Sequence, residues 1–171
     1  MKPEEISKDI FDVGIRDWTC SDFHGFATPR GVTYNSFLIM DEKVCLIDGV
    51  KAPFAERQLY KISEVVDPQK VDYIVVNHVE PDHAASLQEV LIRHPETKVI
   101  SNEKAFDLMR QFGFSVDDRA EVVTEGDTRK FGKHTIAFVA APMVHWPEAM
   151  VSFDTTTGTL FSADAFGTFG A

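Results

Sequence analysis

Short runs of apolar, often β-branched residues alternate along the chain with stretches in which apolar residues recur every three or four positions. The runs are typical of buried strands, and the wider spacing is typical of amphipathic helices. The runs predict strands at residues 10–15, 34–39, 44–48, 73–76 and 98–101. The spaced residues predict three helices, through Ala55, Leu59, Ile62 and Val66, through Ala84, Leu87, Val90 and Leu91, and through Ala105, Leu108, Met109 and Phe112.

Turn-forming residues separate these elements. Three polar residues at 41–43, between two apolar runs, predict a β-hairpin, and residues 20–31 predict a loop. Gly113 is expected to cap the third helix. From Glu121 onward the pattern is β only, with strands predicted at residues 121–123, 129–131, 134–139, 149–153 and 159–162. The sequence therefore predicts an α/β fold with substantial antiparallel β content.

The composition indicates one folded domain covering residues 1–171. An apolar fraction of 44% and 14 Phe residues are enough for a core. The formal net charge of −10 disfavours nucleic acid and anionic membranes as partners. Cys20 and Cys45 form no disulfide framework, no apolar run has transmembrane length, and the N-terminus does not resemble a signal peptide. We therefore expect a cytoplasmic protein.

The chemistry of the chain centres on residues 77–83, Asn-His-Val-Glu-Pro-Asp-His, between a predicted strand and a predicted helix. Pro81 disfavours the helical region for Glu80, so we expect this segment to stay extended, with alternate side chains on one side. The side chains expected to converge are His78, Glu80 and Asp82, with His83 following as the helix begins. Buried charges are costly without a partner, and a bound cation would offset that cost. The stretch therefore predicts a metal site.

The ligand types narrow the choice of metal without deciding it. Structural zinc sites depend on cysteine, and Cys20 and Cys45 lie far from the cluster in sequence. Catalytic zinc uses histidine and carboxylate, so zinc stays open. A set rich in carboxylate and imidazole also suits iron or manganese, especially as a bridged pair.

Other polar residues lie where such a site could recruit them. His145 is in a loop after a predicted strand, and Asp164 follows another strand; either position alone is more typical of a loop or a helix cap. His24, in the predicted loop, would by itself be read as a surface histidine. Asp48, at a strand end, could support the site. Trp18 and Trp146 are read as packing residues, and His94 and His134 are read as structural or surface residues.

Three motifs together resemble the metallo-β-lactamase-like domain of flavodiiron proteins. They are His78-x-Glu80-x-Asp82-His83, His145-Trp146-Pro147-Glu148 and Ser162-Ala163-Asp164-Ala165-Phe166-Gly167. Residues 31–39 and Asp48-Gly49 also look like segments of that family. Hydrolases of this fold usually have histidine at the position of Glu80, so the resemblance favours an iron site over the zinc site of a hydrolase. It implies a metallo-β-lactamase-like αβ/βα sandwich.

The resemblance also implies a role for each candidate residue. One iron would be held by His78, Glu80 and His145. The second would be held by Asp82, with His83 as a variable ligand, and Asp164 would bridge the two ions. His24 would reach into the substrate pocket. The implied reaction is reduction of dioxygen to water or of nitric oxide to nitrous oxide.

Flavodiiron proteins continue past the segment that resembles residues 162–167, and they supply a further histidine to the second iron. They also carry a flavodoxin-like domain whose FMN feeds electrons to the metals. We therefore expect the sandwich to be incomplete at its C-terminal half. FMN is expected on a missing domain or a partner, and a rubredoxin or flavoprotein is expected as electron donor. A fragment, a split gene, or a chain completed by a homodimer or another chain would each explain the length.

Three alternatives follow from the same residues. A diiron site without a flavin domain could bind dioxygen or nitric oxide as a sensor, without turnover. A zinc-dependent hydrolase of the same fold is disfavoured by Glu80. The chain could also be a structured remnant without a function.

Overall fold

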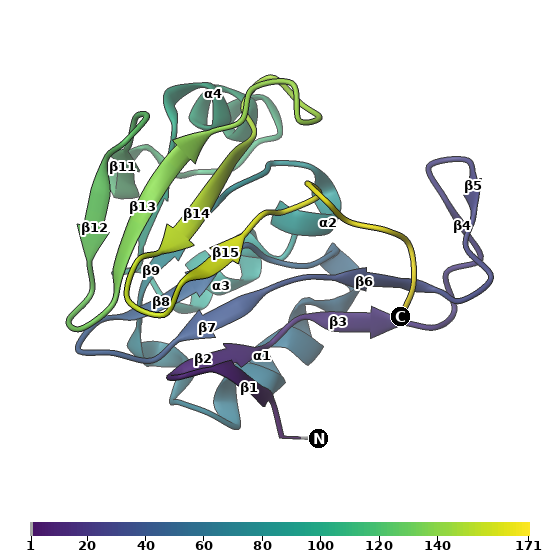
Figure 1. Cartoon of the computed structure of the whole chain (residues 1–171), viewed down its shortest axis with the longest axis horizontal. Coiled ribbons are helices and arrows are strands. Elements are labelled where there is room, and N and C mark those ends of the chain that lie inside the picture. Colours follow the sequence, from purple (N-terminus) through teal and green to yellow (C-terminus); the bar gives the residue numbers. More distant parts are fainter. Residues whose placement is uncertain (1) are drawn as a thin grey trace.

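A computed structural model describes residues 2–171, and within that range a sheet of seven strands forms the middle layer (Figure 1). In spatial order its strands are β1 (Glu4–Ser7), β2 (Ile10–Asp12), β7 (Phe37–Ile39), β8 (Val44–Ile47), β9 (Val71–Val75), β10 (Lys98–Ser101) and β11 (Ala120–Val122). Neighbouring strands from β1 to β8 pair antiparallel, and neighbouring strands from β8 to β11 pair parallel. The predicted hairpin is therefore confirmed as β7 and β8.

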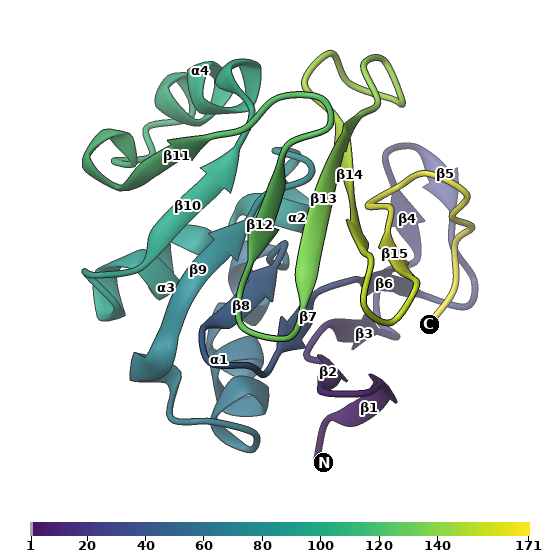
Figure 2. The ribbon, with the colours of Figure 1, turned by 60° about the vertical axis from the view of Figure 1, so that its left-hand side comes forward.

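Helices connect the parallel strands, as a parallel ladder requires. They are α1 (Ala55–Ser63), α2 (Pro81–Ala84), α3 (Leu87–Arg93) and α4 (Glu103–Gln111), with short 3₁₀ turns at Ala52–Phe54, Pro68–Lys70 and Asp117–Arg119. α1, α3 and α4 cover one face of the large sheet (Figure 2). None of the helices described is long and apolar enough to cross a bilayer.

A second sheet covers the other face of the large sheet, which gives a helix–sheet–sheet arrangement (Figure 2). It is antiparallel and consists of β12 (Thr128–Lys130), β13 (Thr135–Ala140), β14 (Met150–Asp154) and β15 (Thr159–Phe161). Phe131, Phe138 and Phe161 of this half are buried against Ile47 and Val75 of the large sheet. Both faces of β8 and the end of β9 are therefore buried, as their unbroken apolar runs predict.

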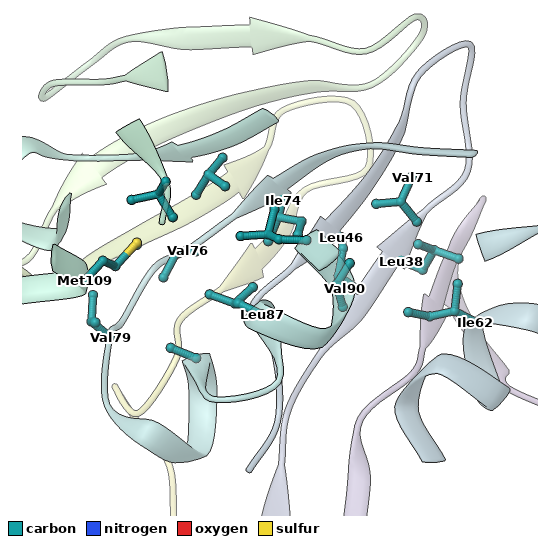
Figure 3. Close-up of a cluster of buried hydrophobic side chains, with 14 of the residues drawn as sticks. Leu38, Leu46, Ile62, Val71, Ile74, Val76, Val79, Leu87, Val90 and Met109 are labelled. Carbon is teal, nitrogen blue, oxygen red and sulfur yellow. The ribbon is translucent and has the colours of Figure 1, made fainter. Parts of the chain in front are cut away.

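The largest core lies between the large sheet and its helices (Figure 3). Leu46 and Ile74 project from neighbouring strands towards Leu87 and Val90 of α3, and Phe106 of α4 is fully buried in the same cluster. The apolar stripes of the predicted helices thus face the sheet. This packing fixes the ends of β8 and β9, from which the site residues emerge.

The end of α4 agrees with the sequence prediction. Gly113 has a φ of 82°, and its N–H donates to the Arg110 carbonyl at 3.0 Å while the Phe114 N–H donates to the Met109 carbonyl at 2.9 Å. This is the Schellman arrangement, in which glycine adopts the left-handed conformation at low cost.

Some local predictions were wrong. The strand predicted at residues 10–15 is interrupted at Gly14, whose N–H is bonded to the Asp12 side chain at 2.8 Å. Its second half, β3 (Ile15–Asp17), instead pairs with β6 (Val32–Tyr34) in a separate two-stranded sheet. The predicted loop contains another hairpin, of β4 (Asp22–Phe23) and β5 (Phe26–Ala27).

Two further corrections concern helices and packing. Val66 lies beyond α1, and the stripe from Ala84 to Leu91 is split between α2 and α3 at Ser86. The Ser86 hydroxyl accepts from the Val50 N–H and donates to the Gln58 side chain, which fixes this break. Trp18 was expected to pack inside but is 67% exposed.

Truncation of Phe106 should be far more damaging than truncation of Phe112, which is 48% exposed at the end of the same helix. Phe106→Ala leaves a cavity, so we expect a loss of about 3–5 kcal/mol in the free energy of unfolding. Phe112→Ala should change it by less than about 1 kcal/mol. Chemical denaturation of both variants checks this, and similar losses would contradict the core assignment.

His94 should make the fold acid-sensitive. It is 6% exposed, and neither ring nitrogen has a hydrogen-bond partner among the described residues. Burial, and then the Arg93 charge, lower the pKa of His94 from its usual 6.5. The unfolded chain therefore takes up this proton first as the pH falls, and stability is lost below the usual histidine pKa. Urea denaturation between about pH 7.5 and 5.5 should show that the free energy of unfolding falls less steeply with decreasing pH in His94→Leu than in the unaltered chain. Identical pH dependences would contradict this role of His94.

Candidate metal centre

The candidate ligands lie at one edge of the two sheets, where several strands end. Residues 77–83 leave the end of β9, next to the end of β8, because these two strands are parallel. The segment after β15 passes α2 (Figure 1), and there Asp164 Oδ1 lies 2.9 Å from His83 Nε2. His145 arrives in the loop between β13 and β14. Segments far apart in sequence therefore meet here.

The backbone of the central stretch is only partly as expected. Glu80 is extended, with φ −56° and ψ 143°, and Pro81 opens α2, as the proline predicted. Asp82 was expected to be extended too, but it lies in α2, whose first turn already includes it. The carboxylate still reaches the cluster, since Asp82 Oδ2 is 3.4 Å from His83 Nε2.

The first group of donors contains two imidazoles and two carboxylates. His78, Glu80, His145 and Asp164 each offer one ligand atom, all within 4.8 Å of one another. Glu80 Oε2 is 3.1 Å from His78 Nε2 and 2.9 Å from His145 Nε2. Four such atoms in one small volume could hold a metal ion.

Two further groups share carboxylates with the first. One contains Asp82, His83 and Asp164, and the other contains His24, Glu80 and Asp82. Asp164 uses its two oxygens on different partners, with Oδ2 3.3 Å from His145 Nε2 and Oδ1 2.9 Å from His83 Nε2. The structure thus brings all the predicted site residues together, in three groups of donors that share carboxylates.

Buried polar atoms without a hydrogen-bond partner also indicate a cation site. Asp82 Oδ1 and His83 Nδ1 are buried and have no hydrogen-bond partner among residues 2–171. Burial raises the pKa of Asp82, and the charges of Asp164 and Glu80 raise it further. The pKa of His83 rises to about 9 because its hydrogen bond to Asp164 and the nearby carboxylates outweigh the effect of burial. A donor set of this kind fits a cation.

Glu148 has a role that the sequence analysis did not assign. Its Oε1 accepts hydrogen bonds from His78 Nδ1 at 2.8 Å and from the Val79 N–H at 3.1 Å. Burial opposes ionisation of Glu148, but these bonds outweigh burial and lower its pKa. The His78 ring is thereby turned so that Nε2 faces Glu80. The sequence did contain a signal for this role, because Glu148 is the last residue of the His-Trp-Pro-Glu motif.

Asp48 supports the start of the ligand stretch. It is buried at the end of β8, and its oxygens accept from the N–H and the side-chain amide of Asn77 at 2.7 and 3.0 Å. Asn77 Oδ1 in turn accepts from Ser152 in β14 at 2.6 Å. The residue before His78 is therefore tied to both sheets.

The centre opens into a cavity of about 620 Å³. Its apolar wall includes Phe23, Phe26, Trp146 and Phe169. The Trp146 ring packs edge-on against His78 at 5.2 Å, so Trp146 is a packing residue that also lines the cavity. His24, between β4 and β5, lines the same cavity, and its Nε2 is 3.2 Å from Glu80 Oε1.

Comparisons with known proteins agree with this geometry. Residues 32–171 match the family model described as ODP family beta lactamase. The chain is 38% identical to a nitric oxide reductase of Moorella thermoacetica over 168 residues, 97% of this chain and 42% of the relative. It is also 38% identical to a rubredoxin-oxygen oxidoreductase of Megalodesulfovibrio gigas, with coverage of 98% and 42%.

The fold is also similar to that of a solved structure. The flavodiiron protein from Giardia intestinalis superimposes with a TM-score of 0.94 at 34% identity, over 100% of this chain and 42% of that one. The chain thus spans 42% of the length of these relatives. The metallo-β-lactamase-like α/β fold expected from the motifs is confirmed. The chain belongs to the ODP family of beta lactamases, and it shares this domain with flavodiiron proteins.

Proposed function

We propose that this chain carries the metal centre of a flavodiiron-type oxidoreductase, which reduces dioxygen to water or nitric oxide to nitrous oxide. The observation that carries the proposal is the convergence of His78, Glu80, His145 and Asp164 within 4.8 Å, beside a second group that shares Asp164. The printed names of the relatives, nitric oxide reductase and rubredoxin-oxygen oxidoreductase, support it.

The contacts support a particular assignment of ligands. His78, Glu80 and His145 would hold the first iron, Asp82 would hold the second with His83 nearby, and Asp164 would bridge the two sites. The bridging role is supported by Asp164 itself, since its Oδ2 faces His145 and its Oδ1 faces His83. When bound, two ferrous ions would supply electrons for the reduction of a diatomic gas.

Iron fits this donor set better than zinc. Structural zinc sites favour cysteine and histidine in tetrahedral sets, whereas carboxylates shared between histidine-containing groups are typical of paired iron or manganese. Glu80 contributes two oxygens that face different imidazoles. We therefore propose two iron ions as the cofactor.

The protein around the centre provides orientation and access. Glu148 holds His78 through Nδ1, which leaves Nε2 for the metal. The apolar side chains of the cavity wall suit a small uncharged substrate. Electrons would come from FMN on another domain or a partner chain, with a rubredoxin or flavoprotein as the donor before it. We further propose that a second copy or a completing chain takes part.

Metal retention and gas consumption together test the proposal. Loaded with Fe²⁺ without oxygen and then desalted, the 171-residue chain should retain about two iron ions. With chemically reduced FMN, this protein should consume dioxygen or nitric oxide faster than FMN alone. His145→Ala should lower both readouts, because it removes a ligand. Two bound irons without faster consumption would contradict the reductase proposal, and preferential zinc binding with ester cleavage would favour a hydrolase.

Replacement of Glu148 should weaken metal binding without unfolding the protein. Glu148→Gln removes the charge that orients His78, and we expect affinity for Fe²⁺ to fall about 10–100-fold in chelator competition. Asp154→Asn is a matched control, because Asp154 is an equally buried carboxylate that bonds His134 Nδ1 at the same 2.8 Å. That variant should lose stability but keep its metal affinity. Equal effects on metal affinity would contradict a specific role for Glu148.

A further inference from the structure

A second cavity, of about 320 Å³, is lined by residues of β3, α1 and the first strands of the chain, near the N-terminus (Figure 1). It shares no lining residue with the cavity of the metal centre. A pocket of this volume is large enough for a small molecule. The residues around it come from segments far apart in sequence, so their convergence is a property of the fold.

β3 and α1 each bring positive charge and an aromatic ring to this cavity. Arg16 of β3 and Trp18, two positions further on, alternate with buried residues, so both side chains project to the outer side of the strand. Arg57, Tyr60 and Lys61 are three and four positions apart in α1, a spacing that places them on one face of the helix. All five residues line the cavity.

The charge of the cavity is opposite to that of the chain. The whole chain has a formal net charge of −10. The charged residues that line the cavity are instead four cations and two carboxylates, which give a local formal charge of +2: Lys2, Arg16, Arg57, Lys61, Glu4 and Asp12. A positive hollow on an otherwise acidic surface concentrates anions.

Asp12 is the carboxylate that balances the cations at the centre of the cavity. Its Oδ2 is 3.5 Å from Arg16 Nη2 and its Oδ1 is 3.7 Å from Lys61 Nζ, while Arg57 has no ion-pair partner within the described part of the chain. Burial lowers the pKa of Lys61, and the charges of Arg16 and Arg57 lower it further against the opposing effect of Asp12. The cations therefore repel one another, and a bound anion would relieve this repulsion.

Lys61 is already fixed in position. Its side chain is 18% exposed, and its Nζ donates to the Gly14 carbonyl at 2.6 Å. The backbone at Gly14 is packed closely, because a Cβ there would lie 2.4 Å from the Tyr34 carbonyl oxygen. The interruption between β2 and β3 therefore holds the ammonium group, and a ligand would not have to order this side chain.

The two aromatic rings of the cavity are largely exposed. Trp18 is 67% exposed and Tyr60 is 57% exposed, although burial of such rings is favourable. Tryptophan, tyrosine and arginine are the residues that most often supply binding energy at interfaces. Flat heterocycles stack on exposed aromatic side chains, and arginine adds to this attraction. A ligand with a flat ring would therefore cover apolar surface that the fold leaves open.

We propose that this cavity binds a small molecule that carries a phosphate monoester on a flat ring system, as a nucleoside monophosphate does. A phosphate monoester has a charge of about −1.5 to −2 at pH 7, which matches the local charge of +2. Arg16, Arg57 and Lys61 hold the phosphate, since guanidinium groups bind phosphate through paired hydrogen bonds. The ring lies on Trp18 and Tyr60. This site is separate from the proposed metal centre and independent of its chemistry.

Calorimetric titration of the 171-residue chain with AMP tests the proposal, with inorganic phosphate and adenosine as separate probes. We expect AMP to bind more than about 10-fold more tightly than either probe, because each probe lacks one of the two contacts. Arg57→Gln should weaken the binding of both AMP and phosphate by about 10-fold. Trp18→Ala should weaken AMP binding by about 10-fold and leave phosphate binding unchanged.

NMR spectra of the ¹⁵N-labelled chain locate the bound AMP. The chain has two tryptophans, and Trp146 lines the cavity of the metal centre. AMP should shift the indole N–H signal of Trp18 and leave the signal of Trp146 in place. A shift of the Trp146 signal alone would place AMP at the metal centre and overturn the proposal.

Lys104→Gln is the matched control for the loss of one positive charge. Lys104 is exposed on α4 and lies outside the cavity, so this variant should bind AMP as the unaltered chain does. The proposal is overturned if AMP does not bind, if it binds no more tightly than phosphate, or if Lys104→Gln and Arg57→Gln weaken its binding equally. In each of these cases the proposed function of the metal centre is unaffected.

Discussion

The crowding of Glu80, Asp82 and Asp164 at one edge of the two sheets is the constraint on which the rest of the site depends. Neighbouring carboxylates repel one another, and the burial of Glu80 and Asp82 removes water that would otherwise screen them. Imidazoles are interleaved among them, with His83 between two carboxylates and Glu80 between histidines. Such a cluster persists only if the backbone beneath it cannot relax, so the supporting bonds matter as much as the ligands.

Those supporting bonds reach every layer of the fold. Asp48 and Ser152 hold Asn77 between the two sheets, and Gln58 of α1 bonds Ser86 at 2.7 Å beside the turn that carries the ligands. Gly49 lies so close that a Cβ there would be 2.5 Å from the Ser86 hydroxyl. Gly49 is therefore needed for the close approach of this loop to the segment between α2 and α3. The helices thus contribute to the site through hydrogen bonds as well as through packing.

Periodicity predicted most of the fold, because long apolar runs and stripes report burial directly. It failed where a side chain bonds the backbone, because apolar periodicity does not report such bonds. Asp12 accepts from the Gly14 N–H two residues further on, and Ser86, between two helices, accepts from the Val50 N–H, which is distant in sequence. The motifs identified the candidate ligands because each motif is a short stretch that can be recognised in the sequence alone. Glu148 received no role because its partner, His78, lies 70 positions away.

Two buried histidine–carboxylate pairs in this fold differ in the surroundings of the second nitrogen of each imidazole ring. His78–Glu148 and His134–Asp154 share the same Nδ1 geometry at 2.8 Å and similar burial. Asp154 is further satisfied by hydroxyl and amide donors of its own turn, and among the described residues Asp154 is the one carboxylate that pairs with His134. His78 instead turns its other nitrogen towards Glu80 and Asp164, and within residues 2–171 neither of these carboxylates forms an ion pair with a lysine or an arginine. The chemical difference between a structural pair and a ligand therefore lies at the far nitrogen, where unsatisfied negative charge accumulates and a cation is favoured.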